Sequence, residues 1–221
     1  LRRPGTDEDQ GEVIGLSLIY SGNFLAQAEV DTWYTTRVTL GINPFGFDWK
    51  LPPGEAFQTP EAVVVYSCRG MNAMSQAFHR LYRSRLARGQ WRDRPRPILI
   101  NNWEATYFGF TQDKLLEIAG AARADGAELF VLDDGWFGAR QNDFAGRGDW
   151  TPNRDRLPDG LSGLARRVND LGMQFGLWFE PEMVNKDSGL YRAHPDWIIH
   201  VPDRRESQGR NQYVLDFSRP E

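Results

Sequence analysis

The spacing of apolar and polar residues changes character along the chain. Up to about residue 68 polar and apolar positions alternate, as in residues 36–40 (TRVTL), and Ser-Gly, Asn-Pro and Pro-Pro-Gly signals interrupt the pattern. Alternation in a region rich in β-branched and aromatic residues is typical of half-buried strands, and the interruptions are typical of turns. We therefore predict that residues 1–70 are the end of a β-sandwich domain.

A helical spacing follows this region. Met74, Phe78, Leu81 and Tyr82 recur at i, i+4, i+7 and i+8, which places them on one face of a helix from about residue 71 to residue 86. The Arg-Pro-Arg-Pro run at residues 94–97 then breaks the pattern. This predicts a linker helix within residues 71–96 and a domain boundary near residues 90–96.

From residue 97 onward, short apolar runs alternate with helical segments. The predicted strands are 97–100, 128–132 and 174–179, and the predicted helices are 111–125, with Thr111 as N-cap, and 160–171, closed by Gly172. Strands that alternate with helices indicate an α/β fold with a parallel sheet, and strands that are apolar throughout are buried on both faces. The pattern leaves open whether residues 213–218 (YVLDFS) form another strand or part of a long excursion.

Polar and aromatic side chains follow each of the three apolar runs. They are Asn101, Asn102, Trp103 and Glu104 after the first, Asp133, Asp134 and Trp136 after the second, and Trp178, Glu180 and Glu182 after the third. The carboxyl ends of parallel strands carry the ligand site both in a (β/α)8 barrel and in an open doubly wound sheet. The glycine-rich phosphate fingerprint of the doubly wound sheet is absent, which argues against a nucleotide ligand.

The adjacent carboxylates of Asp133 and Asp134 need partners, because two buried like charges repel each other. A divalent cation is one possible partner, with Glu180 and Glu182 as further oxygen ligands. Sugar hydroxyls are a second, since a carboxylate accepts their hydrogen bonds. In a third, structural arrangement, one Asp caps the following turn and the other pairs with an arginine. The tryptophans at all three strand ends favour the sugar, because the apolar face of a pyranose stacks on an indole ring.

Composition and charge narrow the choice of partners. The 221 residues carry a formal net charge of −4, which argues weakly against nucleic acid, and the arginine-rich residues 80–96 are interpreted as a solvated helix face and linker. No run of 18 apolar residues occurs, so no membrane partner is expected. Cys68 is the only cysteine, which fits a reducing compartment, and a cytoplasmic location is expected. Because the first residue is Leu1, we expect the chain to be part of a longer protein.

Several longer segments together resemble one known family. In chain order they are NNWEATYF, LFVLDDGWFGAR, GDWTPN, LPDGL, GLWFEPEMVN, HPDW and GRNQYVLDFSRPE. This ordered set resembles the α-galactosidases of glycoside hydrolase family 36, and NPFGFDWKLPPGEAF is similar to the end of the N-terminal β-sandwich domain of that family. The resemblance implies a partial (β/α)8 TIM barrel in residues 97–221, preceded by the C-terminal part of a β-sandwich and a linker helix.

The same resemblance implies a retaining hydrolase that removes terminal α-linked galactose from raffinose or melibiose, with no cofactor and no metal. The residues it assigns to galactose binding are Asp133, Asp134, Trp103, Trp178 and Arg210. The two aspartates would hold the 4- and 6-hydroxyl groups, and Arg210 would reach the pocket from a long insertion. The nucleophile, in a Lys-Trp-Asp motif, and the acid/base Asp are expected beyond Glu221. The isolated chain is therefore expected to be inactive and prone to aggregate.

Other functions remain open at this point. A raffinose-synthase-like transglycosylase would share the pocket and pass galactose to a sugar acceptor. A non-catalytic galactose-binding barrel would keep the recognition residues and lack the downstream carboxylates. A metal-dependent barrel enzyme would use Asp133, Glu180 and Glu182. If the resemblance to glycoside hydrolase family 36 holds, the longer protein is expected to be a homo-oligomer with an α-galactoside oligosaccharide as its substrate.

Overall fold

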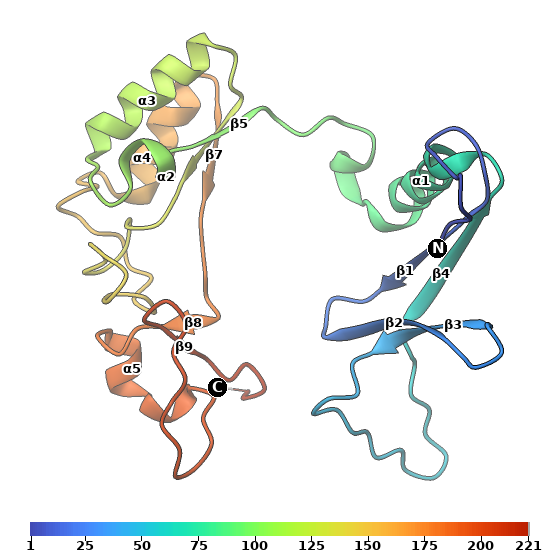
Figure 1. The fold of residues 1–221 in the computed structure, drawn as a ribbon. Coiled ribbons are helices and arrows are strands. Elements are labelled where there is room, and N and C mark those ends of the chain that lie inside the picture. Colours follow the sequence, from blue (N-terminus) through green and yellow to red (C-terminus); the bar gives the residue numbers. More distant parts are fainter. Residues whose placement is uncertain (221) are drawn as a thin grey trace. The chain divides into compact units, whose positions relative to one another are not determined.

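The computed structural model describes residues 1–220, so the last position of the predicted domain 97–221 lies outside the described part. The chain divides into two compact units, the first from Leu1 to Pro95 and the second from Arg96 onward. Figure 1 shows the course of the chain through both units, with the first in blue to green and the second in green to red.

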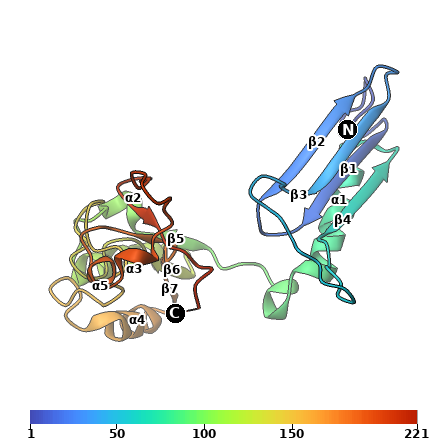
Figure 2. The ribbon, with the colours of Figure 1, turned by 90° about the horizontal axis from the view of Figure 1, so that it is seen from below.

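The first unit contains two antiparallel pairs of strands. β1 (Val13–Ile19) pairs with β4 (Glu61–Ser67), and β2 (Phe24–Val30) pairs with β3 (Thr36–Ile42), as the arrows in Figure 2 show. All four strands fall in the region where alternation predicted β-structure. That prediction of the element type is confirmed.

The helix α1 (Gly70–Leu81) packs against β1 and β4. The approach is close at Gly15, where an added Cβ would lie 2.5 Å from Met74 Sδ and 2.6 Å from the Phe78 ring. The predicted face of the helix therefore meets the strands. The predicted helix to about Leu86 is confirmed, with its last turn, Tyr82–Leu86, in π-helical form, and a 3₁₀ turn (Gly89–Arg92) follows.

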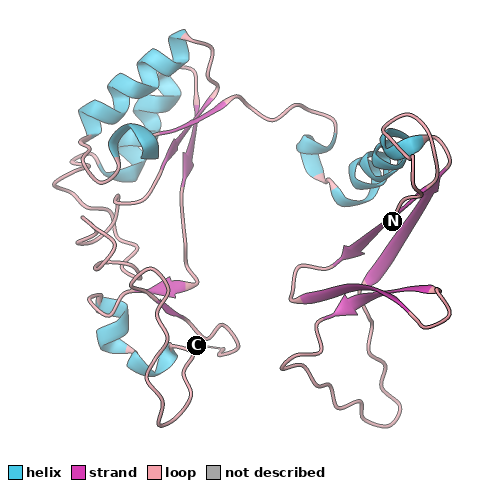
Figure 3. Cartoon of the chain, viewed as in Figure 1, coloured by secondary structure: helices cyan, strands magenta, loops and turns pink. Residues whose placement is uncertain are grey.

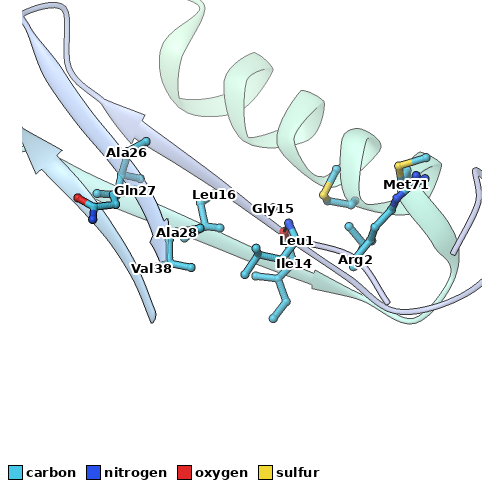
Figure 4. A pocket seen from close by; sticks show the side chains of 13 residues that line it. Leu1, Arg2, Ile14, Gly15, Leu16, Ala26, Gln27, Ala28, Val38 and Met71 are labelled. Atoms are coloured by element: carbon cyan, nitrogen blue, oxygen red, sulfur yellow. Dashed lines mark hydrogen bonds between the residues drawn. The ribbon is translucent and has the colours of Figure 1, made fainter. Parts of the chain in front are cut away.

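An apolar cavity of about 500 Å³ lies in the first unit, and Figure 4 shows the side chains that line it. Its lining comes from β1, from the β2–β3 hairpin and from α1, and includes Leu16, Ala28 and Val38. Arg2 and Gln27 are the polar side chains of this lining. The cavity therefore differs in character from the acidic strand ends to which the sequence points.

The second unit is built on a parallel sheet with the strand order β5-β6-β7. Its strands are β5 (Leu99–Asn101), β6 (Leu129–Leu132) and β7 (Gln174–Leu177), and the helices α3 (Gln112–Ala124) and α4 (Gly160–Asp170) connect them. Figure 3 shows this alternation of strands and helices in two colours. The predicted α/β class and the parallel pairing are confirmed.

The two helices lie side by side and cover one face of the middle strand, where Phe130 and Leu132 are buried, whereas Leu129 and Val131 on its other face are only half-buried. The fully buried core positions of α3, α4 and β6 are Leu115, Ala119, Leu164, Val168, Phe130 and Leu132. Burial of a Leu, Val or Phe side chain contributes about 1.5–3 kcal/mol, so this cluster dominates the stability of the second unit. The predicted N-cap is confirmed, since Thr111 Oγ1 accepts from Lys114 N at 3.3 Å.

After β7 the chain makes an excursion outside the parallel sheet. β8 (Met183–Val184) pairs antiparallel with β9 (Tyr213–Val214), and α5 (Gly189–Ala193) and a 3₁₀ turn (Pro195–Trp197) lie between them in the sequence. A small core of Val184, Ile198 and Tyr213 holds this region together. Residues 213–218 thus belong to an excursion. Among residues 1–220, no helix has both the length and the apolar character needed to cross a membrane.

Candidate functional site

The register of the parallel sheet brings the polar ends of its strands to one edge. Asp133 N donates to Asn102 Oδ1 at 2.8 Å, so the ends of β5 and β6 are joined by a hydrogen bond. Trp178 N donates to Leu132 O at 2.9 Å, which joins the ends of β6 and β7. The three groups of polar and aromatic residues singled out in the sequence therefore meet at the carboxyl ends of adjacent strands.

Asp133 is half-buried, and protein donors use only some of the acceptor positions of its carboxylate. Asn101 Nδ2 donates to its Oδ2 at 2.6 Å, and Asp134 N donates to its Oδ1 at 2.7 Å. An ionised carboxylate has about four acceptor positions, so roughly two remain for a ligand. The carboxylate is thus held in place and still able to accept hydrogen bonds from outside.

Asp134 is buried, with 3% of its surface exposed, and two arginines bind it. Arg140 Nε donates to Oδ1 at 2.9 Å and Arg140 Nη2 donates to Oδ2 at 2.7 Å, while Arg147 Nη2 donates to Oδ2 at 2.9 Å. Both guanidinium groups are fully buried. Asp134 therefore pairs with arginine, as in the third of the arrangements that the sequence allowed for the two aspartates. This pairing leaves one acceptor position of Oδ1 unused.

Arg147 contacts side chains that follow two different strands. It forms an ion pair with Glu180 through Nη1, and its guanidinium carbon lies 4.8 Å from the centre of the Trp178 ring. The amide of Gln212, whose oxygen is the accepting atom, faces Arg147 Nε at 3.2 Å and Nη2 at 3.3 Å. Burial, and next the charge of Arg140, lower the pKa of Arg147 from its ordinary value.

Asn185, which is fully buried, ties the loop after β6 to the excursion after β7. Its Oδ1 accepts from Arg140 Nη1 at 3.1 Å and from Arg147 N at 2.9 Å. Its Nδ2 donates to Asp143 O and to Asn211 O, both at 3.0 Å. Arg140, Arg147 and Asn185 were not among the site residues predicted from the sequence. The signal that could have found the two arginines was the need of a buried Asp for a cationic partner.

The tryptophans at the strand ends differ in their surroundings. Trp103 is partly exposed and packs edge-on against Tyr107, with ring centres 5.2 Å apart, and Asn101 Oδ1 accepts from its backbone N at 2.7 Å. Trp178 is also partly exposed. Trp136, in contrast, is 1% exposed and donates from Nε1 to Trp178 O at 3.0 Å. The interpretation of all three as ligand surfaces is therefore wrong for Trp136, which belongs to the core.

Arg210 lies near the same acidic groups. Its Nη1 is 4.0 Å from Glu180 Oε1 and its Nη2 is 4.0 Å from Asp143 Oδ1, while 67% of its side chain is exposed. Its φ of +52° places it in the left-handed region. The excursion thus brings the exposed Arg210 guanidinium to Glu180, the residue that also binds Arg147.

The described part of the chain was also compared with the metal site that the sequence allowed. Within residues 1–220, no three or more His, Cys, Asp or Glu side chains are grouped so that they could hold a metal ion. Asp133, Glu180 and Glu182 therefore form no ready ligand set, and the carboxylate of Glu180 is directed to arginines instead.

Comparison with known proteins gives two family matches along the chain. Residues 56–221 match the Melibiase family, and residues 1–52 match the glycosyl hydrolase family 36 N-terminal domain. Alpha-galactosidase AgaA of Geobacillus stearothermophilus is 65% identical over 96% of this chain. Alpha-galactosidase Mel36A of Lactobacillus acidophilus is 50% identical over 98% of it. The chain spans 29% and 30% of the lengths of these two proteins.

Solved structures show the same similarity in three dimensions. The crystal structure of the GH36 alpha-galactosidase AgaB from Geobacillus stearothermophilus matches with a TM-score of 0.93 and 64% identity. The match covers 99% of this chain and 30% of the AgaB chain. Two substituted forms of AgaA, crystallised in complex with stachyose and with raffinose, each have a TM-score of 0.93 and 62% identity, with the same coverage.

Proposed function

The chain belongs to the Melibiase family of glycoside hydrolase family 36 enzymes, and from this premise we propose that the protein is a retaining α-galactosidase and that this chain forms its galactose-recognition part. The observation that supports the proposal best is the half-buried Asp133 carboxylate, which Asn101 and the backbone of Asp134 fix at the end of β6. The named activity of its relatives and the raffinose and stachyose complexes of AgaA support the substrate class.

Each recognition residue has a distinct part in this proposal. Hydroxyl groups of galactose donate to Asp133 and to the unused position of Asp134 Oδ1, in charge-assisted bonds that contribute about 1.5–3 kcal/mol each. Trp103 and Trp178 offer indole surface to the apolar face of the sugar. Arg210 donates to sugar oxygens from the excursion. Because a glucoside places its 4-hydroxyl differently, it would leave one carboxylate without its donor.

We further propose that β5, β6 and β7 are the first three strands of a (β/α)8 barrel. Their parallel order and the grouping of polar residues at their carboxyl ends support this, since a barrel carries its active site there. The domain bounds 1–70, 71–96 and 97–221 belong to the same proposal. A homo-oligomeric protein and a cytoplasmic location stay predictions from the sequence.

The two carboxyl groups that perform the hydrolysis are proposed to lie outside this chain. A retaining glycosidase needs a nucleophile and an acid/base about 5–5.5 Å apart. Asp134 and Glu180 are bound by buried arginines, so neither is free to attack the sugar or to exchange a proton. The strand ends described here therefore hold the sugar, and the bond-breaking groups come from elsewhere in the protein.

The first test is the substitution Asp133→Asn in the full-length protein. It keeps the side-chain shape and removes the charged acceptor, and we expect kcat/KM on raffinose to fall by about 10²- to 10⁴-fold. Asp187→Asn is the matched control, because Asp187 is exposed and pairs with Arg192 at 2.9 Å on the surface. An unchanged kcat/KM in the Asp133 variant would contradict the assignment. Product analysis with and without an added sugar acceptor separates hydrolysis from galactosyl transfer.

A further inference from the structure

Arg147 is the side chain through which the separate parts of the candidate site contact one another. Its fully buried guanidinium donates to Asp134 Oδ2 at 2.9 Å, at the end of β6, and pairs with Glu180, beyond β7. It lies over the Trp178 ring at 4.8 Å and meets the oxygen of Gln212, which precedes β9, at 3.2 Å. One group thus contacts the segments that follow two strands of the sheet and the excursion.

The contacts of Arg147 depend on the shape of the guanidinium as well as on its charge. The guanidinium lies over the indole while its N–H groups donate to Asp134 and Gln212, and a lysine ammonium cannot reproduce all of these contacts. Burial and the neighbouring Arg140 oppose the charge by lowering the pKa of Arg147, and Asp134 and Glu180 favour it. The two carboxylates therefore favour the charged form of Arg147 that these hydrogen bonds require.

We propose that Arg147 is a positioning residue that sets the indole of Trp178 relative to the Asp134 carboxylate. The guanidinium covers one face of the partly exposed ring, so the sugar would use the ring surface that remains open. Because Arg147 itself has no exposed side-chain surface, it would act on the sugar only through Trp178 and Asp134. This inference rests on the proposed galactose-recognition function and adds a residue to it.

The test measures the affinity of the full-length protein for galactose by calorimetric titration. We would compare Arg147→Lys, Trp178→Phe and the double variant with the wild type. Arg192→Lys is the matched control, because this arginine is exposed on α5 and pairs only at the surface with Asp187. The dissociation constant does not depend on how much of the sample is folded, whereas the apparent stoichiometry does. A loss of folded protein alone would therefore change the stoichiometry and leave the affinity unaltered.

We expect Arg147→Lys to weaken galactose binding by about fivefold to twentyfold, and Arg192→Lys to leave it unchanged. The effects of the two substitutions should be less than additive in the double variant, because part of the effect of the arginine passes through this ring. Wild-type affinity in Arg147→Lys, with a lowered stoichiometry or melting temperature, would overturn the inference. Fully additive effects of the two substitutions would overturn it as well.

A second variant and the behaviour of the wild type complete the test. If Arg147→Lys yields no folded protein, Gln212→Met removes the neutral acceptor of Arg147 and should weaken galactose binding in the same direction, while an unchanged affinity would reject the inference. Binding of galactose without hydrolysis of raffinose by the wild type would reject the hydrolase and still permit the comparison of variants. Absence of galactose binding in the wild type would reject both.

Discussion

At the scale of single residues, the two adjacent aspartates have different surroundings and should differ in what they contribute. Asp133 is half-buried with acceptor positions to spare, whereas Asp134 is 3% exposed and carries two arginines. The sequence could show that both carboxylates needed partners. It could not show which partner each one has, because Arg140 and Arg147 lie on a loop whose path follows no periodic pattern.

The substitution Asp134→Asn should therefore act on stability. Removing the charge leaves two buried guanidinium groups without their common anionic partner, and loss of one partner of a buried ion pair costs about 3–5 kcal/mol. The measurement is the free energy of unfolding of the full-length protein in denaturant. Asp187→Asn breaks an exposed pair and should change it by about 0–1 kcal/mol. Equal effects of the two substitutions would show that the arginine cluster is not a stabilising element.

At the scale of elements, the sequence predicted the helices and strands that have a clear pattern of apolar residues of their own. α3 and α4 have apolar positions at helical spacing and clear end signals, and β6 is a continuous apolar run. The two-residue strands β8 and β9 have no such pattern, because their pairing depends on the small core of the excursion. The helix was predicted through to Leu86, but the sequence could not show that its last turn is π-helical, because the helical spacing of apolar residues continues into that turn.

The N-cap of α3 offers a test at this scale. Thr111 Oγ1 accepts from Lys114 N, and loss of such a cap costs about 1 kcal/mol. We expect Thr111→Ala to lower the free energy of unfolding by that amount and Thr111→Ser to retain most of it, because serine keeps the accepting oxygen. Denaturant unfolding of both variants checks this. If serine were as destabilising as alanine, the hydroxyl would not be the group that stabilises the helix.

At the scale of the whole molecule, both edges of the parallel sheet are open in the described part of the chain. β5 and β7 each pair with β6 alone. At the start of β5, the apolar side chains of Ile98 and Leu99 are 63% and 53% exposed. The sequence indicated the strands and their parallel order. It could not by itself show what covers these edges, since the chain spans only 29–30% of the relatives described above.

An open edge with exposed apolar residues is a template for pairing with another chain. We therefore expect residues 1–221, produced alone, to aggregate and to show no turnover of raffinose. Light scattering and sedimentation measure the first property, and sugar release measures the second. Leu99→Lys places a charge at the open edge and should reduce aggregation without restoring turnover, because a charge at an edge strand opposes edge-to-edge pairing. A monomeric sample that melts cooperatively and hydrolyses raffinose would show instead that these residues suffice both for folding and for catalysis.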